Sequence, residues 1–173
     1  GGEWKRRSLP FASIEGLRPT PDRVRETLFN WLMWDIQNAQ VLDLCSGSGA
    51  LGFEALSRGA AKVIMIEPNP TQARFLKDNI QLLKAENCQL MVSTAQQALN
   101  KLNGGFDVVF LDPPYSLALW QELAELAEPL IRPNAYIYVE ADRDLSQLKL
   151  PAGWQIIKET KAGMVRAGLY QKM

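Results

Sequence analysis

Apolar residues along the chain follow two spacings, one typical of strands and one typical of helices. Short apolar runs predict strands at 40–45, 62–67, 88–93, 106–111 and 135–140. Helical spacing predicts helices at 22–35, with Asp22 as the N-cap, and at 50–58, 70–84, 95–102 and 117–127. Two further strands, at 154–159 and 165–171, are predicted to form an antiparallel pair.

The alternation of strands and helices predicts the fold class. Strands that are apolar throughout are typical of a parallel sheet covered by helices on both faces. We therefore expect an α/β, Rossmann-like fold with a doubly wound, mostly parallel seven-stranded sheet and a terminal antiparallel strand. Ligands of such sheets bind beside the carboxyl ends of the strands, so functional residues are expected just after residues 45, 67, 93 and 111.

The composition excludes several classes of function. The chain has 173 residues, enough for one domain, and no apolar stretch long enough to span a bilayer. It contains no histidine, which excludes Ser-His-Asp and Cys-His catalysis and most catalytic zinc sites. Its two cysteines, Cys45 and Cys88, suit a reducing compartment and fit no zinc-site spacing. We expect a cytoplasmic monomer that binds neither a metal nor a membrane.

The formal net charge is zero, but basic residues are concentrated near the N-terminus. Residues 1–25 contain six basic and three acidic side chains, which gives this stretch a net charge of +3. The basic residues are Lys5, Arg6, Arg7, Arg18, Arg23 and Arg25. Such a stretch can attract phosphates, although charge alone favours an ordinary solvated surface. We divide the chain into a basic N-terminal arm at 1–21 and a globular domain at 22–173.

A glycine-rich motif follows the first predicted strand. The sequence GSGALG at 47–52 lies between a strand and a helix, where glycines allow a tight turn and a close approach of the backbone to a ligand. Glu67 ends the next strand, twenty residues after Gly47, and its carboxylate can accept hydrogen bonds from both hydroxyls of an adenosine ribose. Together these features indicate a cofactor that contains adenosine.

Asp43 helps to distinguish between the possible cofactors. It lies four residues before the first glycine, close to where a dehydrogenase binds a pyrophosphate at the N-terminus of the helix. A carboxylate there suits a ligand with an ammonium group and a sulfonium charge, which favours S-adenosylmethionine over NAD. The alternative is that Asp43 only stabilises the loop. Cys45 is interpreted as a small core residue beside the turn.

The most informative stretch is DPPY at 112–115, directly after an apolar strand. Two prolines fix the backbone and free the carbonyl of Pro113 from helical or sheet bonding. Asp112 adds a carboxylate acceptor, while Pro114 precedes Tyr115, which adds an aromatic face. This set suits a planar base whose NH2 group donates two hydrogen bonds while the ring stacks.

An exocyclic amine is a poor nucleophile because its lone pair is delocalised into the ring. Two acceptors that bind its hydrogens favour a pyramidal nitrogen and direct the lone pair at the methyl group. Catalysis is then mainly alignment and electrostatic support, without a need for a strong base. An isolated tetrapeptide of this kind would be interpreted as a proline-rich turn with a packed tyrosine. Its place after the fourth strand favours the catalytic interpretation.

From about residue 22 onward, the chain resembles the amino-methyltransferases with a Rossmann-like fold, through DLCSGSGALG at 43–52, Glu67 and DPPY at 112–115. Its N-terminal stretch is similar to the RsmD family, through GGEWKRR at 1–7, GLRPT at 16–20 and DRVRETLFNWL at 22–32. The resemblance implies S-adenosylmethionine as cofactor and S-adenosylhomocysteine as product. The implied reaction is methylation of the N2 amine of one guanine in 16S ribosomal RNA, within the small ribosomal subunit or its precursor.

The resemblance also implies roles for single residues. The residues expected to line the methionine and ribose of the cofactor are Ser46, Gly47, Ser48 and Gly49. Glu67 is expected to bind the ribose, and Thr27 to belong to a helix that closes over the methionine end. Ala95 follows the third strand, where many relatives have an Asp that contacts the adenine amine. The sequence here is STAQ at 93–96, so backbone groups are expected to recognise the adenine.

The basic residues of 1–25 are candidates for RNA phosphate contacts, which supply position and salt-dependent affinity rather than base recognition. For Arg23 and Arg25 the alternative is pairing with Glu26 or Asp22 on the helix surface. The target guanine must leave its stack to reach Asp112, by base flipping or because it already lies unstacked in a loop.

Three other functions stay open. An adenine-N6 DNA methyltransferase would need a target-recognition segment, and no insertion here is long enough to supply one. An NAD-dependent dehydrogenase would leave DPPY unexplained and would have no histidine for proton transfer. A non-catalytic RNA-binding assembly factor would keep the fold without the activity, although both motifs are intact.

Overall fold

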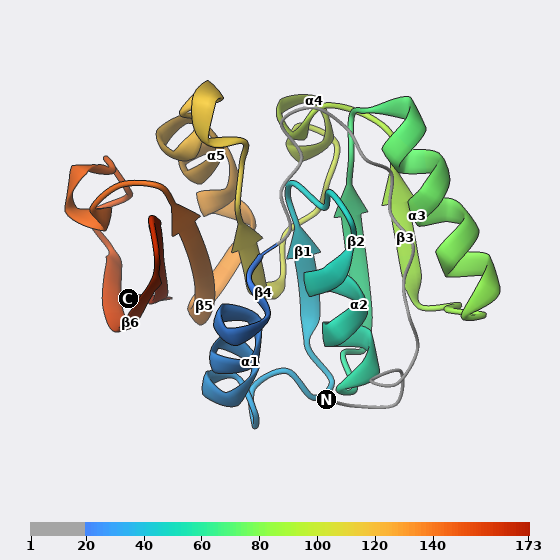
Figure 1. Cartoon of the computed structure of the whole chain (residues 1–173), viewed down its shortest axis with the longest axis horizontal. Coiled ribbons are helices and arrows are strands. Elements are labelled where there is room, and N and C mark those ends of the chain that lie inside the picture. The colour runs from blue at the N-terminus through green and yellow to red at the C-terminus, as the bar shows by residue number, and fades with distance from the viewer. Residues whose placement is uncertain (1–19) are drawn as a thin grey trace.

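The computed structural model describes residues 20–173, which form a seven-stranded sheet with helices on both faces (Figure 1). The strands are β1 (Gln40–Asp43), β2 (Lys62–Ile66), β3 (Cys88–Met91), β4 (Phe106–Leu111), β5 (Ile131–Ala141), β6 (Trp154–Ala162) and β7 (Val165–Lys172). Their order is β3-β2-β1-β4-β5-β7-β6. Neighbours among β1 to β5 are parallel, whereas β7 is antiparallel to β5 and β6. The predicted fold class and the antiparallel final pair are confirmed.

Helices cover the sheet on both sides. They are α1 (Asp22–Trp31), α2 (Ala50–Ser57), α3 (Pro70–Leu82), α4 (Ala95–Leu99) and α5 (Trp120–Ala127). Because side chains of a strand alternate between faces, β4 directs Val108 and Phe110 to the core beneath α1, α2 and α3. It directs Val109 and Leu111 to the second core, beneath α4 and α5. Two buried faces explain why the parallel strands are apolar throughout.

Several elements end earlier than the apolar pattern predicts, and two begin elsewhere. Residues Tyr115–Leu117 form a 3-10 helix and Ala118 has a positive φ of 48°, so α5 starts only at Trp120. β5 starts at Ile131 rather than 135, and its register against β4 shifts before Tyr136. The shift coincides with Pro133, which has no amide hydrogen, and the next residue has a φ of 68°. Two further 3-10 helices are Glu128–Leu130 and Leu145–Gln147.

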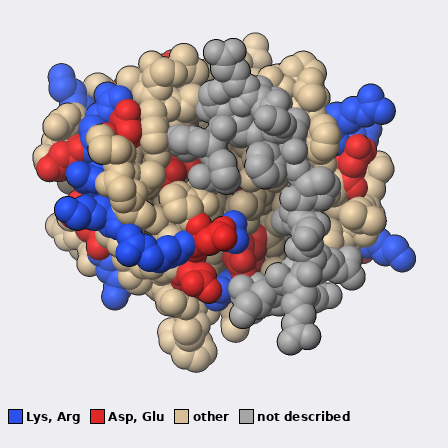
Figure 2. Space-filling view, in the orientation of Figure 1, with Lys and Arg blue, Asp and Glu red and all other residues tan. Residues whose placement is uncertain are grey.

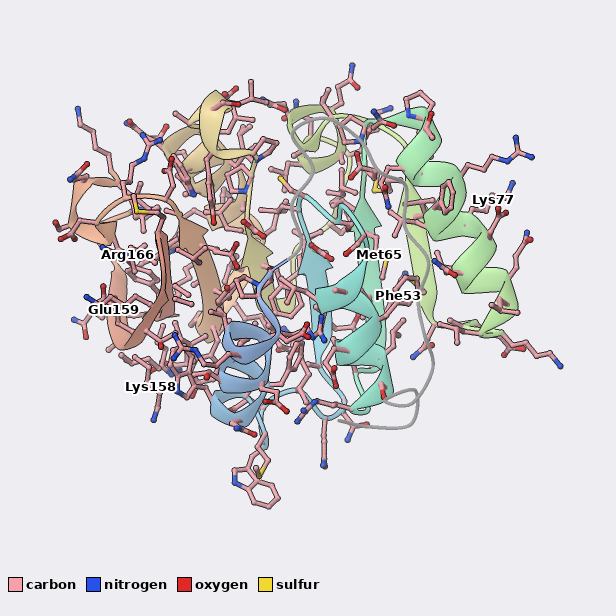
Figure 3. The ribbon with its side chains drawn as sticks, in the orientation of Figure 1. Phe53, Met65, Lys77, Lys158, Glu159 and Arg166 are labelled. Carbon is pink, nitrogen blue, oxygen red and sulfur yellow. The ribbon has the colours of Figure 1, made fainter. Side chains whose placement is uncertain are left out.

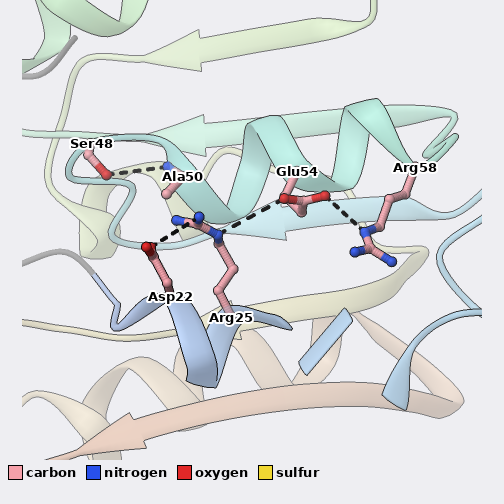
Figure 4. Close-up of polar contacts among 6 residues, drawn as sticks. All are labelled: Asp22, Arg25, Ser48, Ala50, Glu54 and Arg58. Atoms are coloured by element: carbon pink, nitrogen blue, oxygen red, sulfur yellow. Dashed lines mark hydrogen bonds and ion pairs between the residues drawn. The ribbon is translucent and has the colours of Figure 1, made fainter. Parts of the chain in front are cut away.

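The start of α1 differs from the prediction by one residue. Pro21 occupies the N-cap position and Asp22 is the first helical residue, without a side-chain cap. Its carboxylate pairs with Arg25 instead, at 3.2 Å. Arg25 also lies 4.0 Å from Glu54 on α2, and Glu54 pairs with Arg58 at 2.9 Å (Figure 4). This chain of ion pairs connects the first turns of α1 with α2.

The turn after β1 ends at Gly49, whose left-handed φ of 82° favours glycine. A Cβ at this position would lie 2.5 Å from the ring of Phe53 and 2.6 Å from the side chain of Leu76. Both residues are buried in the core beneath α2 and α3, where Figure 3 labels Phe53 beside Met65. The glycine therefore lets the turn lie directly against the core.

We predict that Gly49→Ala lowers the free energy of unfolding by about 2–4 kcal/mol, because the new Cβ adds overpacking to an unfavourable φ. Gly105→Ala is the matched control, since Gly105 has a φ of 104° but its Cβ would meet nothing closer than 3.6 Å. That control is expected to lose only about 1–2 kcal/mol. Urea unfolding measures both, and equal losses would contradict a packing constraint at Gly49.

Candidate functional site

The parallel strands bring most of the predicted cofactor and acceptor residues to one edge of the sheet. These residues lie at or after the carboxyl ends of β1, β2, β3 and β4, whereas Thr27 lies on α1. The backbone amide of Ser46 donates to the carbonyl of Ile66 at 3.0 Å, and that of Leu44 donates to the carbonyl of Phe110 at 3.2 Å. The turn after β1 therefore lies between the ends of β2 and β4.

Glu67 connects two turns at this edge. Its Oε1 accepts from the amide of Gly47 at 2.9 Å, and its Oε2 accepts from the amide of Asn69 at 3.0 Å. The side chain is only 8% exposed, and burial raises its pKa while the two amide bonds oppose the rise. Each carboxylate oxygen can accept more than one hydrogen bond, so the two amides do not exhaust its capacity.

Asp43 is the most deeply buried acid of the turn, at 2% exposure. Its Oδ2 lies 3.2 Å from where a Cβ on Gly52 would be, which places it beneath the first turn of α2. Within residues 20–173 this oxygen has no hydrogen-bond partner. Burial raises the pKa of Asp43 to about 7; the hydroxyl of Ser46 and the amide of Gly52 oppose the rise, and the charge of Glu67 adds to it.

The DPPY segment begins where β4 ends. Asp112 is half-buried, and its Oδ2 accepts from the hydroxyl of Thr20 at 3.4 Å. Pro113 is buried and Pro114 is exposed. The ring of Tyr115 stacks on Trp120, with ring centroids 6.1 Å apart and planes 27° apart. Sequence reasoning missed Thr20, because its partner is far away in the chain.

Glu140 is a buried acid that the sequence did not indicate as a site residue. It is 0% exposed at the end of β5, and its carboxyl group accepts from the hydroxyls of Tyr115 at 3.0 Å and Tyr138 at 2.6 Å. Burial, followed by the charges of Glu140 and Asp112, raises the pKa of Tyr138 well above its ordinary value. A charged residue ending an apolar strand at the same edge was the available signal.

Other predicted cofactor residues have local partners. The hydroxyl of Ser46 donates to the carbonyl of Asp43 at 3.2 Å, and that of Ser48 accepts from the amide of Ala50 at 3.4 Å (Figure 4). Ala95 is the first residue of α4, directly after the N-cap. The hydroxyl of Thr27 donates to the carbonyl of Arg23, one turn earlier in α1, at 2.9 Å. This hydrogen bond is internal to the helix.

The predicted RNA-contacting residues are only partly described. Lys5, Arg6, Arg7 and Arg18 lie outside the described residues. Arg23 is exposed and donates to the carbonyl of Lys161 on β6 at 2.7 Å, whereas Arg25 is engaged by the ion pairs with α2. Figure 2 shows basic side chains on the side of the molecule where β6 and β7 lie. Figure 3 labels two basic residues of these strands, Lys158 on β6 and Arg166 on β7.

Among residues 20–173, no helix has both the length and the apolar character that crossing a membrane requires. No group of three or more His, Cys, Asp or Glu side chains there could hold a metal ion.

Comparison with solved structures identifies the class of fold. The structure of the Escherichia coli protein yhhF superposes with a TM-score of 0.91 at 43% identity, covering 99% of this chain and 95% of that chain. An RNA methyltransferase from Salinibacter ruber, solved with S-adenosyl-L-homocysteine, shares the fold at a TM-score of 0.69 and 17% identity, covering 90% and 94% of the two chains. The fold is that of the class I methyltransferases.

Sequence comparison identifies the family. The model of the family described as Conserved hypothetical protein 95 matches residues 1–171, and the chain belongs to this family. A Haemophilus influenzae relative, Ribosomal RNA small subunit methyltransferase D, is 46% identical over 98% of this chain and 91% of its own length. The protein of that name from Escherichia coli is 43% identical over 99% and 88%. The expected resemblance to the RsmD family is confirmed.

The raised pKa of Asp43 predicts a pH-dependent stability. The ordinary value is 3.8 and the folded value is about 7, so the folded state keeps a proton that the unfolded chain releases over this range. Asp43 therefore makes the protein less stable as the pH rises from about 4 to about 7. Because asparagine cannot ionise, the stability of Asp43→Asn relative to wild type should increase by about 2–3 kcal/mol between pH 5 and pH 8. Urea unfolding across this pH range measures the difference, and a flat or falling difference would exclude the assigned cause.

Proposed function

We propose that this chain transfers a methyl group from S-adenosylmethionine to the N2 amine of a guanine in 16S ribosomal RNA, within the small ribosomal subunit or its precursor. One observation carries the proposal. DPPY and the glycine-rich turn lie at the same edge of the sheet, in a chain that is 46% identical to a relative named as a small-subunit ribosomal RNA methyltransferase. The proposed reaction takes place in the cytoplasm, where ribosomal subunits assemble.

The acids of the turn support the choice of cofactor. Asp43 has a buried oxygen without a partner in the described residues, beneath the N-terminal turn of α2, and it would accept the ammonium group of the methionine. Glu67 would accept the ribose hydroxyls with its remaining lone pairs, and backbone groups beside Ala95 would contact the adenine. Residues 46–49 would line the methionine and ribose. When bound, S-adenosylmethionine supplies the methyl group on a sulfonium that leaves readily.

The residues after β4 would bind and orient the acceptor. The carboxylate of Asp112 and the carbonyl of Pro113 accept the two N–H groups of the amine, and Tyr115 supports the plane of the base. The nitrogen that gains the methyl group would release one proton, which Asp112 or water would accept. Fixed acceptors at the nitrogen stabilise the positive charge that develops there.

The N-terminal residues would bind the RNA. We propose 1–21 as a basic arm that contacts RNA phosphates and 22–173 as the methyltransferase domain. The arm joins the domain beside the acceptor residues, since Thr20 contacts Asp112 at 3.4 Å. Arg23 would extend this surface along α1, while Arg25 is held by Asp22 and Glu54 and contributes less. Phosphate contacts of this kind make binding salt-dependent.

Glu67→Gln tests the cofactor site. An amide keeps one acceptor oxygen but replaces the other with a donor, so it cannot accept from both ribose hydroxyls and both backbone amides. We expect the affinity for S-adenosylhomocysteine to fall by about 10- to 100-fold, as for the loss of a hydrogen bond to a charged group. Titration calorimetry measures the affinity, with Glu54→Gln on α2 as the control. Unchanged affinity in Glu67→Gln would exclude its role at the ribose.

Asp112→Asn tests the acceptor site. Wild-type protein is expected to transfer label from S-adenosylmethionine to 30S subunits of a strain that lacks this enzyme, as N2-methylguanine. Asp112→Asn should reduce this rate by at least about 100-fold, because it loses the charge that supports the developing ammonium. Its affinity for S-adenosylhomocysteine should stay within about twofold of wild type, since Asp112 is assigned to the acceptor and not to the cofactor.

Parallel substrates separate the rival functions. Protein-free 16S RNA at physiological salt is expected to be a poor acceptor, because the arm carries only modest charge. Label in duplex DNA as N6-methyladenine would replace the proposal with a DNA methyltransferase. Cofactor binding without label in any substrate would favour a non-catalytic assembly factor.

A further inference from the structure

We infer that Glu140 is a positioning residue of the methyl-transfer site, which sets the orientation of Tyr115 through the hydrogen bond to its hydroxyl. This inference rests on the proposed function and adds a residue to it. Glu140 is not placed against the substrate, because it is 0% exposed and each of its carboxyl oxygens already accepts from a tyrosine hydroxyl. It acts through the tyrosine of DPPY.

Hydrogen bonds hold both the carboxyl group and the backbone of Glu140 in place. Its Oε2 accepts from Tyr115 at 3.0 Å and its Oε1 accepts from Tyr138 at 2.6 Å, so each oxygen has a hydroxyl donor. Its backbone carbonyl accepts from the indole of Trp120 at 2.9 Å, and its Cα is paired with Ala167 on β7. The group that binds Tyr115 therefore belongs to a paired interior strand and not to a mobile loop.

Within residues 20–173, contacts from different parts of the chain converge on Tyr115. Its hydroxyl is bound by Glu140 on β5, and one face of its ring is covered by Trp120 of α5 at 6.1 Å. Its backbone carbonyl accepts from Arg143 at 3.4 Å. Arg143 in turn lies 4.6 Å from the centre of the Trp120 ring and pairs with Asp142 at 2.8 Å. These contacts fix the plane of the Tyr115 ring relative to Asp112.

The fixed plane matters for the proposed chemistry. A base that stacks on Tyr115 adopts the plane of that ring, and Trp120 restricts stacking to the opposite face. The direction of the amine lone pair then follows from the orientation of the ring. Methyl transfer is sensitive to such alignment, because in-line attack requires the nitrogen, carbon and sulfur to be nearly collinear. A phenylalanine at position 115 would stack equally well, but it would lack the hydrogen bond to Glu140 that orients the ring.

The energetics also point to a purpose beyond packing. The buried carboxyl group of Glu140 and the buried hydroxyl of Tyr138 are costly unless both are hydrogen-bonded, and apolar side chains of similar size would fill the same space at less cost. This free-energy cost is explained if the hydrogen bonds of Glu140 serve to orient Tyr115. Tyr138 keeps the carboxyl group in place for this purpose.

The test is a double-mutant cycle in methyl transfer to 30S subunits from a strain that lacks the enzyme. Tyr115→Phe should lower kcat by about 5- to 20-fold, the equivalent of one hydrogen bond, and Glu140→Ala by about 10- to 50-fold. The double variant should be no slower than Glu140→Ala, since both changes break the same bond. Glu140→Gln retains an acceptor oxygen and should stay within about threefold of wild type. S-adenosylhomocysteine affinity should stay within about twofold in every variant.

Tyr170→Phe is the matched control. Tyr170 is a buried tyrosine of β7 outside the site, so loss of its hydroxyl should leave kcat at the wild-type value. Multiplicative losses in the cycle, or wild-type kcat in Tyr115→Phe, would overturn the role of Glu140. If Glu140→Ala fails to fold, the cycle is run with Glu140→Gln in its place. Any effect of Glu140→Gln on kcat should then disappear in the Tyr115→Phe background, because the hydroxyl that the glutamine would bind is absent there.

A crystal structure of Tyr115→Phe with S-adenosylhomocysteine gives a readout that does not depend on the acceptor. The phenylalanine ring should rotate away from the stacked orientation on Trp120 that Tyr115 has in wild type, or take two orientations. An unmoved ring in a single orientation would overturn the inference even if ribosomal RNA is not the substrate. Conversely, inactive wild-type protein with a displaced ring in the variant would overturn the proposed acceptor and retain the positioning role.

Discussion

Three buried carboxyl groups at one edge of a parallel sheet constrain the structure around them. Asp43, Glu67 and Glu140 are each less than a tenth exposed, and each lies at or just after the carboxyl end of a strand. A buried carboxyl group must be hydrogen-bonded, paired or protonated, because desolvation of an isolated charge is too costly. The turns after β1 and β2, and the tyrosines near β5, are arranged around these three groups.

The three groups are satisfied to different degrees, and the difference follows their proposed roles. Glu140 has a hydroxyl donor on each oxygen, which suits a group that orients a neighbour. Glu67 has one amide on each oxygen and capacity for more, which suits a group that both joins two turns and binds a ribose. Asp43 keeps an oxygen without a partner among the described residues, and its pKa is raised to about 7. A cationic ligand would relieve that cost.

The sequence predicted the elements better than the contacts between them. Strand positions, the sheet class and the turn at Gly49 followed from apolar periodicity and glycine placement, which are local signals. The start of α5 could not be predicted in this way, because the 3-10 turn after DPPY is fixed by tertiary contacts of Tyr115. Likewise Glu140 looked like the polar end of an apolar strand. Its importance depends on the hydroxyls of Tyr138, 2 residues away, and Tyr115, 25 residues away. No pattern in the sequence connects Tyr115 with Glu140.

Helix α1 shows how one surface element can serve both halves of the proposed site. Arg25 connects it to Glu54 on α2, which follows the glycine-rich turn, and Arg23 connects it to the backbone of β6. Just before the helix, Thr20 reaches Asp112. Because Arg25 lies 4.0 Å from Glu54 and its other partner, Asp22, is exposed, these ion pairs contribute little. The docking of α1 therefore depends mainly on buried residues such as Leu28 and Phe29. Phe29 packs edge-on against Phe110 of β4, and Phe110 packs against Tyr138 of β5. The row of packed rings Phe29, Phe110 and Tyr138 therefore runs from α1 to the tyrosine that donates a hydrogen bond to Glu140. The positions of α1 and of the acceptor residues depend on this shared packing.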